Sequence, residues 1–394
     1  MRFYTTADFP ANLMQRSFAA NLMRVQPNGS AKLLALSGMA KTRSLKAVAH
    51  SYWLKRAEFP QFTTVGTHAD SATTINVVSS DGAKVGALLI AFNITAGTFA
   101  APELMRITSI PSGTSIAVAR EQGGTNAVAS LAAGTVLLEV GAMFEEGSSH
   151  PAARSITTTE HTNFTQIFRD SWDVTKTASA VALEPMGSIV AENKTDAAFF
   201  HANSIEWNLL FGRKGVTTIN GRPARLMDGI ESIIQQHAPN NIYAAGSTTT
   251  FTQLESMLHP VLDWAVDGMS GTNRTLFCGS NAMEVINALG RASGYYQLMA
   301  DGEVFGMRFK RFHTSRGTWD LVEHPLLNQH PTTRRMAIIA DLASFDIMWL
   351  RPTEHQDIAF DGVDAVQGVY TSELTVQVPN PMGWGIIYNL TAAA

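Results

Sequence analysis

The chain has 394 residues, of which 45% are apolar and 16% are charged, and its formal net charge is −4. Soluble domains typically hold about 25% charged residues, so the surface is poor in charge, which suits either burial against copies of itself or a β-rich protein with Thr on its strands. The single Cys278 excludes an intrachain disulfide and a four-cysteine metal site, and the longest apolar run, 85–92, is too short for a membrane helix.

Residues 1–58 are expected to form an amino-terminal arm without a core of its own. Residues 1–60 contain nine Lys or Arg and two Asp or Glu, whereas the other 334 residues contain 20 basic and 31 acidic ones. From Ser30 to Arg56, apolar residues recur at helical spacing, which predicts two short helices separated near Gly38. A thin amphipathic arm needs a partner surface to stay ordered. A basic arm can pair with neighbouring bodies or approach nucleic acid, and its apolar side chains favour the neighbours.

The next hundred residues are predicted to be rich in strands, with turns at Asp81-Gly82, Pro111-Ser112-Gly113 and Gly123-Gly124. The predicted strands are 74–79, 87–94, 104–110, 115–120 and 135–140. Thr125, followed by Asn126 to Ala133 and Gly134, predicts one short helix capped at both ends.

A long helix is predicted from Ser188 to Phe211, and its His201 is expected to be a packing or surface residue. A second helical unit begins at Thr250 with capping-box spacing, and Pro260 predicts a kink in it. Residues 274–278 form a predicted buried strand, after which Ser280 opens a helix ending at Gly290.

Strands dominate the rest of the chain. We predict them at 306–313, 318–323, 336–340, 347–350, 366–378 and 385–389. The last two are expected to return to one sheet and close it.

No arrangement of residues with the spacing of a known catalytic motif is present: the sequence lacks a phosphate-binding loop, a Gly-x-Ser-x-Gly elbow and a His-Glu-x-x-His pair. His313, His324 and His330 lie within eighteen residues and could form a metal cluster. Strand alternation places His324 and Glu323 on opposite faces, which argues against it. We therefore expect no catalytic, cofactor-binding or metal-binding residues, and no enzyme.

The order of these elements, with their local sequence, resembles the major capsid proteins of tailed bacteriophages that share the HK97-type shell fold, in the branch with an enlarged extended loop. The resemblance spans about Met39 to Leu390. It rests on the order and spacing of five runs: Arg120 to Thr125, Glu145 to Ser148, Asn163 to Arg169, Leu276 to Gly279, and Glu373 to Val376 before Asn380-Pro381.

The resemblance implies an α+β fold with five regions. These are an N-terminal arm (1–58), an extended loop (59–175) with an inserted β subdomain (about 74–140) on a stalk that includes Asn163 to Asp173, a spine helix and peripheral domain (176–240), an axial domain (241–345) and returning peripheral strands (346–394). Because the sequence starts at Met1, we expect no amino-terminal scaffolding segment to be removed.

The implied function is that of a major capsid protein of a tailed double-stranded DNA phage. Such a chain self-assembles into hexamers and pentamers of an icosahedral shell around the genome. It is built in the bacterial cytoplasm and resides in the virion. The implied partners are other copies, non-specifically contacted DNA, and cement or decoration, scaffolding and portal proteins, without a membrane. The alternatives are a nanocompartment shell of the same fold and a β-rich tail or receptor-binding protein.

Ten residues are candidates for contacts between subunits. They are Arg16, Arg24, Leu33, Leu36, Trp53, Arg106, Arg120, Glu146, Phe164 and Arg169.

Overall fold

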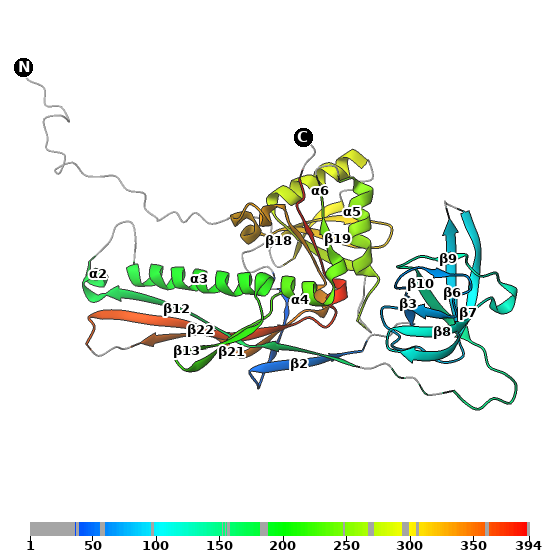
Figure 1. Cartoon of the computed structure of the whole chain (residues 1–394). Helices are drawn as coiled ribbons and strands as arrows, with labels where there is room; N and C mark the ends of the chain where they lie inside the picture. Colours follow the sequence, from blue (N-terminus) through cyan, green and yellow to red (C-terminus); the bar gives the residue numbers. More distant parts are fainter. Residues whose placement is uncertain are drawn as a thin grey trace, which may run out of the picture. The chain divides into compact units, whose positions relative to one another are not determined.

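A computed structural model describes residues 36, 39–55, 60–95, 98–151, 153, 155, 158–181, 188–246, 249–266, 272–293, 299–304, 307–358 and 362–391. The chain divides into two compact units (Figure 1). Unit 1 contains Met1–Tyr52 and His161–Ala394, and unit 2 contains Trp53–Glu160. No described helix is both long enough and apolar enough to cross a membrane.

Unit 2 is built on a six-stranded antiparallel sheet with the order β3-β10-β6-β7-β8-β5. Its strands are β3 (Gln61–Thr63), β5 (Thr74–Asn76), β6 (Ala87–Thr95), β7 (Thr98–Ser112), β8 (Ser115–Ala119) and β10 (Val136–Ala142), and a small second pair joins β4 (His68–Ala69) to β9 (Ser130–Leu131). Alternate apolar residues point to one side and form a separate core that includes Phe62, Leu89, Met105, Ile116 and Leu137. The five strands predicted for this region are confirmed, although β5 is shorter and β7 longer than expected.

The helix predicted from Asn126 to Ala133 is wrong. The segment contains a 3-10 turn, η2 (Gln122–Gly124), a stretch without regular secondary structure and then β9. Thr125 does not cap a helix, because its Oγ1 accepts a hydrogen bond from the Leu104 amide and donates one to the Gln122 carbonyl. Bonds to the neighbouring strand therefore replace those that a helix would have made.

Unit 1 contains a four-stranded sheet of long strands covered by a helix (Figure 1). The sheet order is β1 (Lys41–Ser44), β21 (Asp346–Ile358), β22 (Ala365–Gln377) and β12 (Gln166–Thr175). All ten residues of β12 pair antiparallel with β22. Asn163 to Asp173 was predicted to belong to a stalk, but from Gln166 onward it is a strand of this sheet.

The covering helix, α3 (Ile189–Phe211), confirms the predicted long helix. The Ser188 side chain caps its first turn by accepting from the Ala191 amide. The helix ends at Gly212, and the amide of Gly229 donates to the Gly212 carbonyl. A Cβ on Gly229 would lie 2.4 Å from the Gly212 nitrogen, so the two backbones can approach only because this residue has no side chain.

The arm forms strands where helices were expected. Residues Leu36 and Met39 are helical, but β1 and β2 (Ala49–Leu54) follow, so the helix predicted around Leu45 and Tyr52 is wrong. β1 adds parallel to the edge of β21, and β2 pairs with β11 (Thr159–Phe164). An open sheet edge offers a full set of backbone partners, which outweighs the helical spacing of the side chains.

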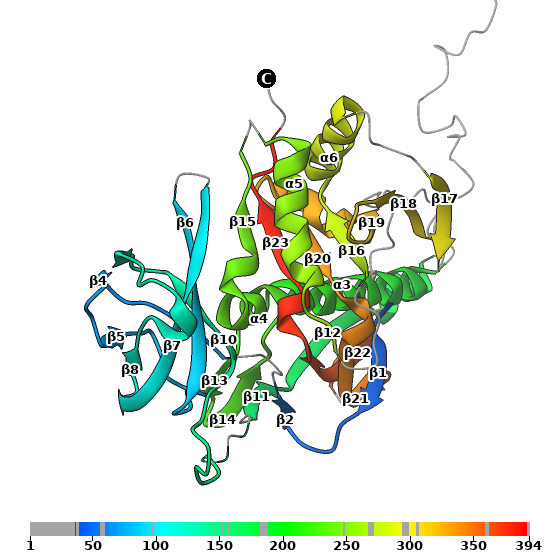
Figure 2. The same cartoon turned by 90° about the vertical axis from the view of Figure 1, so that its right-hand side faces the viewer.

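Unit 1 also contains a seven-stranded sheet with two helices (Figure 2). Its order is β15 (Ile242–Ala244), β23 (Gly385–Tyr388), β20 (Ala337–Ala340), β16 (Asn273–Cys278), β19 (Thr318–Glu323), β18 (Met307–His313) and β17 (Met299–Val304). α6 (Ser280–Ser293) packs on β16 and β19 and contacts α5 (Phe251–Leu258), which the 3-10 turn η4 (His259–Leu262) continues at Pro260. The predicted strand-to-helix unit at 274–290 is confirmed, with the helix extending past Gly290.

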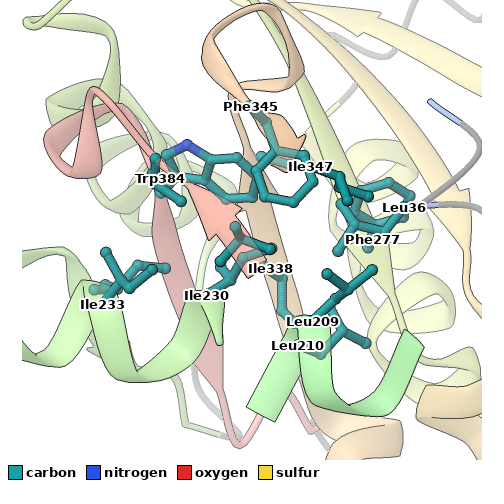
Figure 3. Close-up of a cluster of buried hydrophobic side chains, with 14 of the residues drawn as sticks. Leu36, Leu209, Leu210, Ile230, Ile233, Phe277, Ile338, Phe345, Ile347 and Trp384 are labelled. Atoms are coloured by element: carbon teal, nitrogen blue, oxygen red, sulfur yellow. The ribbon is translucent and has the colours of Figure 1, made fainter. Parts of the chain in front are cut away.

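The prediction that the last two strands close one sheet is wrong. β22 lies in the four-stranded sheet, whereas β23 enters the seven-stranded sheet between β15 and β20. The 3-10 turn η8 (Pro381–Gly383) separates them. A shared core of apolar side chains joins the two sheets through α3 and α4 (Ile230–His237), with Leu209, Ile230, Ile338, Ile347 and Trp384 at its centre (Figure 3).

Candidate contact surfaces

Three of the ten candidate residues, Arg16, Arg24 and Leu33, lie outside the described part of the chain. Leu36 is described, and its side chain is fully buried in the core of unit 1. A neighbouring subunit cannot reach a side chain that its own chain covers. The prediction that Leu36 contacts another subunit is therefore wrong for this structure.

Leu36 instead belongs to a buried polar junction that joins three parts of unit 1. Its amide donates to Glu206 Oε1 on α3 at 2.6 Å, and His324 Nε2 lies 3.2 Å from the same oxygen. The Leu326 amide donates to His324 Nδ1, so Nδ1 is an acceptor and Nε2 carries the proton that points at Glu206. Both side chains are fully buried. The junction therefore fixes the arm to the helix and to the loop after β19.

Sequence analysis missed Glu206 and assigned His324 to a rejected metal cluster. One signal for Glu206 was present in the sequence: it is an acid next to Ile205 in a long helix, and an acid buried with such apolar residues needs a buried partner. Among the residues described, no group of three or more His, Cys, Asp or Glu could hold a metal ion.

The Asn163 to Arg169 run connects several distant segments of unit 1. The buried Asn163 Nδ2 donates to the carbonyls of Asp228 and Val376, and its Oδ1 accepts from the amides of Phe164 and Asp228. Gln166 bonds both Asn208 of α3 and the Met227 amide. These side chains complete backbone hydrogen bonding where β11 turns into β12, so the run positions strands within one chain.

Two candidates in this run have solvent-accessible side chains. Phe164 is half-buried, with Lys214 Nζ 5.3 Å from its ring centroid. Arg169 is exposed on the face of β12 opposite Phe168, next to Ile167, whose side chain is 49% exposed. Both candidates therefore remain available to a neighbour.

A cluster of aromatic rings lies beside this run. His161 Nδ1 is 3.1 Å from His237 Nε2, and the ring of Tyr52 stacks on His161. Burial, the charge of His237 and that of Lys214 lower the pKa of His161, and burial also lowers the pKa of His237. Burial raises the pKa of Tyr52 to about 12, and its hydroxyl donates to the Val378 carbonyl. All three groups are therefore uncharged at neutral pH.

Unit 2 contains the other four candidates, and one of them is internal. Arg120 makes a bidentate ion pair with Glu103, at 2.8 and 2.6 Å, and both side chains are buried. The prediction that Arg120 contacts another subunit is wrong, because the pair joins β7 to the residue directly after β8 within its own unit. Arg106 donates to the Met143 carbonyl and remains partly exposed, while Trp53 and Glu146 are exposed.

His201, expected to be a packing or surface residue, is buried between α3 and the long sheet. Its Nδ1 lies 2.8 Å from Asp170 Oδ2, and its Nε2 lies 2.6 Å from Ser372 Oγ. This order of serine, histidine and acid has the connectivity of a hydrolase triad. Ser372 is completely buried and Thr353 also engages its Oγ, so no substrate carbonyl can reach it. The trio fastens the helix to the sheet.

The sequence matches the family model described as SU10 major capsid protein over residues 3–391. It is 32% identical over 411 residues to the major capsid protein of Pseudomonas phage PaMx41, covering 99% of this chain and 96% of that protein. Among solved structures, the capsid of a native GTA particle computed with C5 symmetry matches with a TM-score of 0.50 and 8% identity, over 98% of both chains. The capsid of Myoviridae phage XM1 matches with a TM-score of 0.45 and 8% identity, over 95% and 97%.

Proposed function

The chain belongs to the SU10 major capsid protein family, and we propose that it self-assembles into the hexamers and pentamers of an icosahedral shell around a double-stranded DNA genome. It is a phage major capsid protein with the HK97-type fold and a component of the virion. The observation that carries the proposal is the family match, which includes the arm and both units.

The geometry of the chain supports an assembling role over a catalytic one. The polar clusters that resemble reactive sites, around Ser372 and Glu206, are buried and internally bonded. Exposed apolar side chains lie instead on strands, as at Ile167 on β12, and on α3, as at Phe200. We propose that the chain has no enzymatic activity, and that it is assembled in the bacterial host cytoplasm.

The five regions inferred from the resemblance remain our assignment. Residues 1–58 would act as the arm, 59–175 as the extended loop, 176–240 as spine helix and peripheral domain, 241–345 as axial domain and 346–394 as returning strands. Two segments depart from this division, because β12 belongs to the four-stranded sheet and β23 joins the seven-stranded sheet. The separate core of unit 2 supports a distinct subdomain in the loop. We also propose the portal, and scaffolding or cement proteins, as partners, and non-specific contact with packaged DNA.

Expression of the full chain in bacteria tests the proposal. We expect closed particles or capsomers by size-exclusion chromatography and electron microscopy. A chain that stays monomeric at high concentration, in the presence and absence of phage lysate, would contradict self-assembly. Particles that enclose a protein cargo and exclude DNA during infection would favour a nanocompartment.

A further inference from the structure

A hairpin that follows α3 is exposed on both faces. It joins β13 (Gly215–Ile219) to β14 (Arg222–Leu226) through Asn220 and Gly221, whose φ angles of 50° and 72° give the tight turn that suits paired strands. Val216, Ile219 and Leu226 are 56%, 59% and 46% exposed. A two-stranded hairpin is only marginally stable alone. Exposed apolar side chains on such a hairpin are typical of a surface that a binding partner covers.

The hairpin is basic as well as apolar. Residues 213–227 contain four Lys or Arg and no Asp or Glu. Arg213 pairs with Glu231, whereas Arg222 and Arg225 have no acidic partner among the described residues. The strand register places Arg222 opposite Ile219 and Arg225 opposite Val216. Two unpaired cations thus stand beside exposed apolar side chains.

A second surface of unit 1 has the opposite charge, and we call it the acidic end. It lies where β12 and β21 finish and β22 starts, because Thr175 pairs with Ala365 and Ile358 with Gln367. It contains α2 (Lys176–Ala180) and the first turns of α3. Among the residues that the structure describes, its charged side chains are the acids Asp173, Glu192, Asp196, Asp357 and Asp364 and the bases Lys176 and Lys194.

Exposed apolar side chains accompany these acids. Val181 and Val363 are 55% and 49% exposed, and Ile358 and Val366 are 36% and 37% exposed. Both bases form ion pairs with acids of the acidic end, Lys176 with Asp364 and Lys194 with Asp357. Asp173 has no cationic partner among the described residues. The acidic end therefore matches the hairpin in both character and sign.

The two surfaces begin at opposite ends of α3 (Figure 1). This helix has 23 residues, which corresponds to about 35 Å at 1.5 Å per residue. No ion pair joins the two surfaces within the described chain. Two complementary surfaces at different places on one chain make a head-to-tail contact between copies, and such contacts form a ring when the rotation between copies closes.

We propose that the β13–β14 hairpin of one copy docks on the acidic end of a second copy, with Arg222 and Arg225 facing Asp173 and Asp364. The inference deepens and rests on the proposed function, because it names one contact through which the shell subunits associate. Nucleic acid would use the two arginines but would leave Val216, Ile219 and Leu226 without apolar partners. The acidic end supplies both kinds of partner, and charge complementarity fixes orientation and suppresses wrong pairings.

A charge exchange in the full-length chain tests the docking. Arg222→Glu with Arg225→Glu should raise the chain concentration needed for particle formation at least tenfold, and Asp173→Lys with Asp364→Lys should do the same. All four changes in one chain should restore most of the assembly. Arg291→Glu with Arg335→Glu, two exposed arginines outside both surfaces, is the matched control and should assemble as the wild type does.

Circular dichroism melting verifies that each variant is folded, and light scattering with electron microscopy measures the particles. Assembly of the hairpin variant at the wild-type concentration overturns the docking, as does failure of the fourfold exchange in a folded chain. Normal particles that package less DNA would show that the hairpin contacts nucleic acid, and would overturn it too. If the wild type and the control also form no particles, the proposed function fails and the docking fails with it.

Discussion

Replacement of Arg120 by Ala should destabilise unit 2 strongly. The guanidinium makes two hydrogen bonds to Glu103, whose side chain is fully buried and has one further donor, the Val128 amide. Removal of the cation leaves a buried carboxylate without its counter-charge. Loss of one partner of a buried pair costs about 3–5 kcal/mol. We expect a loss in this range, confined to the six-stranded sheet of unit 2.

Hydrogen exchange measured by mass spectrometry is the suitable assay, because it reports unit 2 separately from unit 1. When reclosing outpaces exchange, this loss speeds the exchange of protected amides in β7 and β8 by about two to three and a half orders of magnitude. Arg106→Ala is the matched control. Arg106 is partly exposed, and its 3.8 Å pair with the exposed Glu145 is worth about 1 kcal/mol or less. Equal exchange in both variants, or no acceleration in Arg120→Ala, would refute the reasoning.

Three further predictions concern unit 1. Asn163→Ala should lower the free energy of unfolding of unit 1 by about 2–4 kcal/mol in denaturant titrations, because buried backbone groups lose their hydrogen-bond partners. The control Asn193→Ala, which removes one local helix hydrogen bond, should cost less than about 1 kcal/mol, and equal losses in the two variants would contradict the prediction. Burial lowers the pKa values of His161 and His237, so the unfolded chain binds protons more readily than the folded chain, and the free energy of unfolding should fall as the pH drops below about 6.5. His237→Gln should weaken this pH dependence, and an unchanged slope of the free energy of unfolding against pH would contradict the prediction. The fully buried Cys278, whose thiol pKa burial raises, should react with a thiol reagent at pH 8 only after unfolding, and reaction of the native chain would disprove its burial.

Elements with strong local signals could be predicted from the sequence. α3 has a Ser188 cap and Gly212 at its end, and the helix after Thr250 begins with a capping box that the structure contains. β16 and β19 contain buried apolar residues, such as Leu276 and Leu321, and pair with each other within the seven-stranded sheet. In each case the propensity of the segment and its burial favour the same structure.

Other elements depend on partners that lie far away in the chain. Lys41–Ser44 is a strand because the edge of β21 is available, and nothing within the segment indicates that edge. β23 pairs with β20 and β15, about fifty and one hundred and forty residues earlier. The short helix expected after Thr125 is absent because its hydroxyl bonds to Leu104. Long-range pairing decided these segments, and a local pattern carries no information about it.

The difference between local sequence signals and long-range structure also explains why some of the residues predicted to contact another subunit are buried within their own chain. Arg120 and Leu36 were chosen for residue type and for their place in a motif or arm, yet the side chain of each is buried against its own chain. An arginine or leucine in a short sequence run can lie in an interface or in the core of its own chain, and only the fold shows which of these two positions it occupies. Arg169 and Trp53 are exposed, as a contact requires, and their predicted role remains to be tested.

The internal polar junctions also bear on how a shell subunit can associate reversibly. Asn163 and Glu206 are satisfied within the chain, so the strand register around them is set before any neighbour arrives. A neighbour then has only preformed surfaces to cover, and each contact needs little additional ordering. Modest contacts of this kind become strong when every subunit makes several at once. Weakening a single docking surface should therefore affect assembly much more than it affects the folding of the chain.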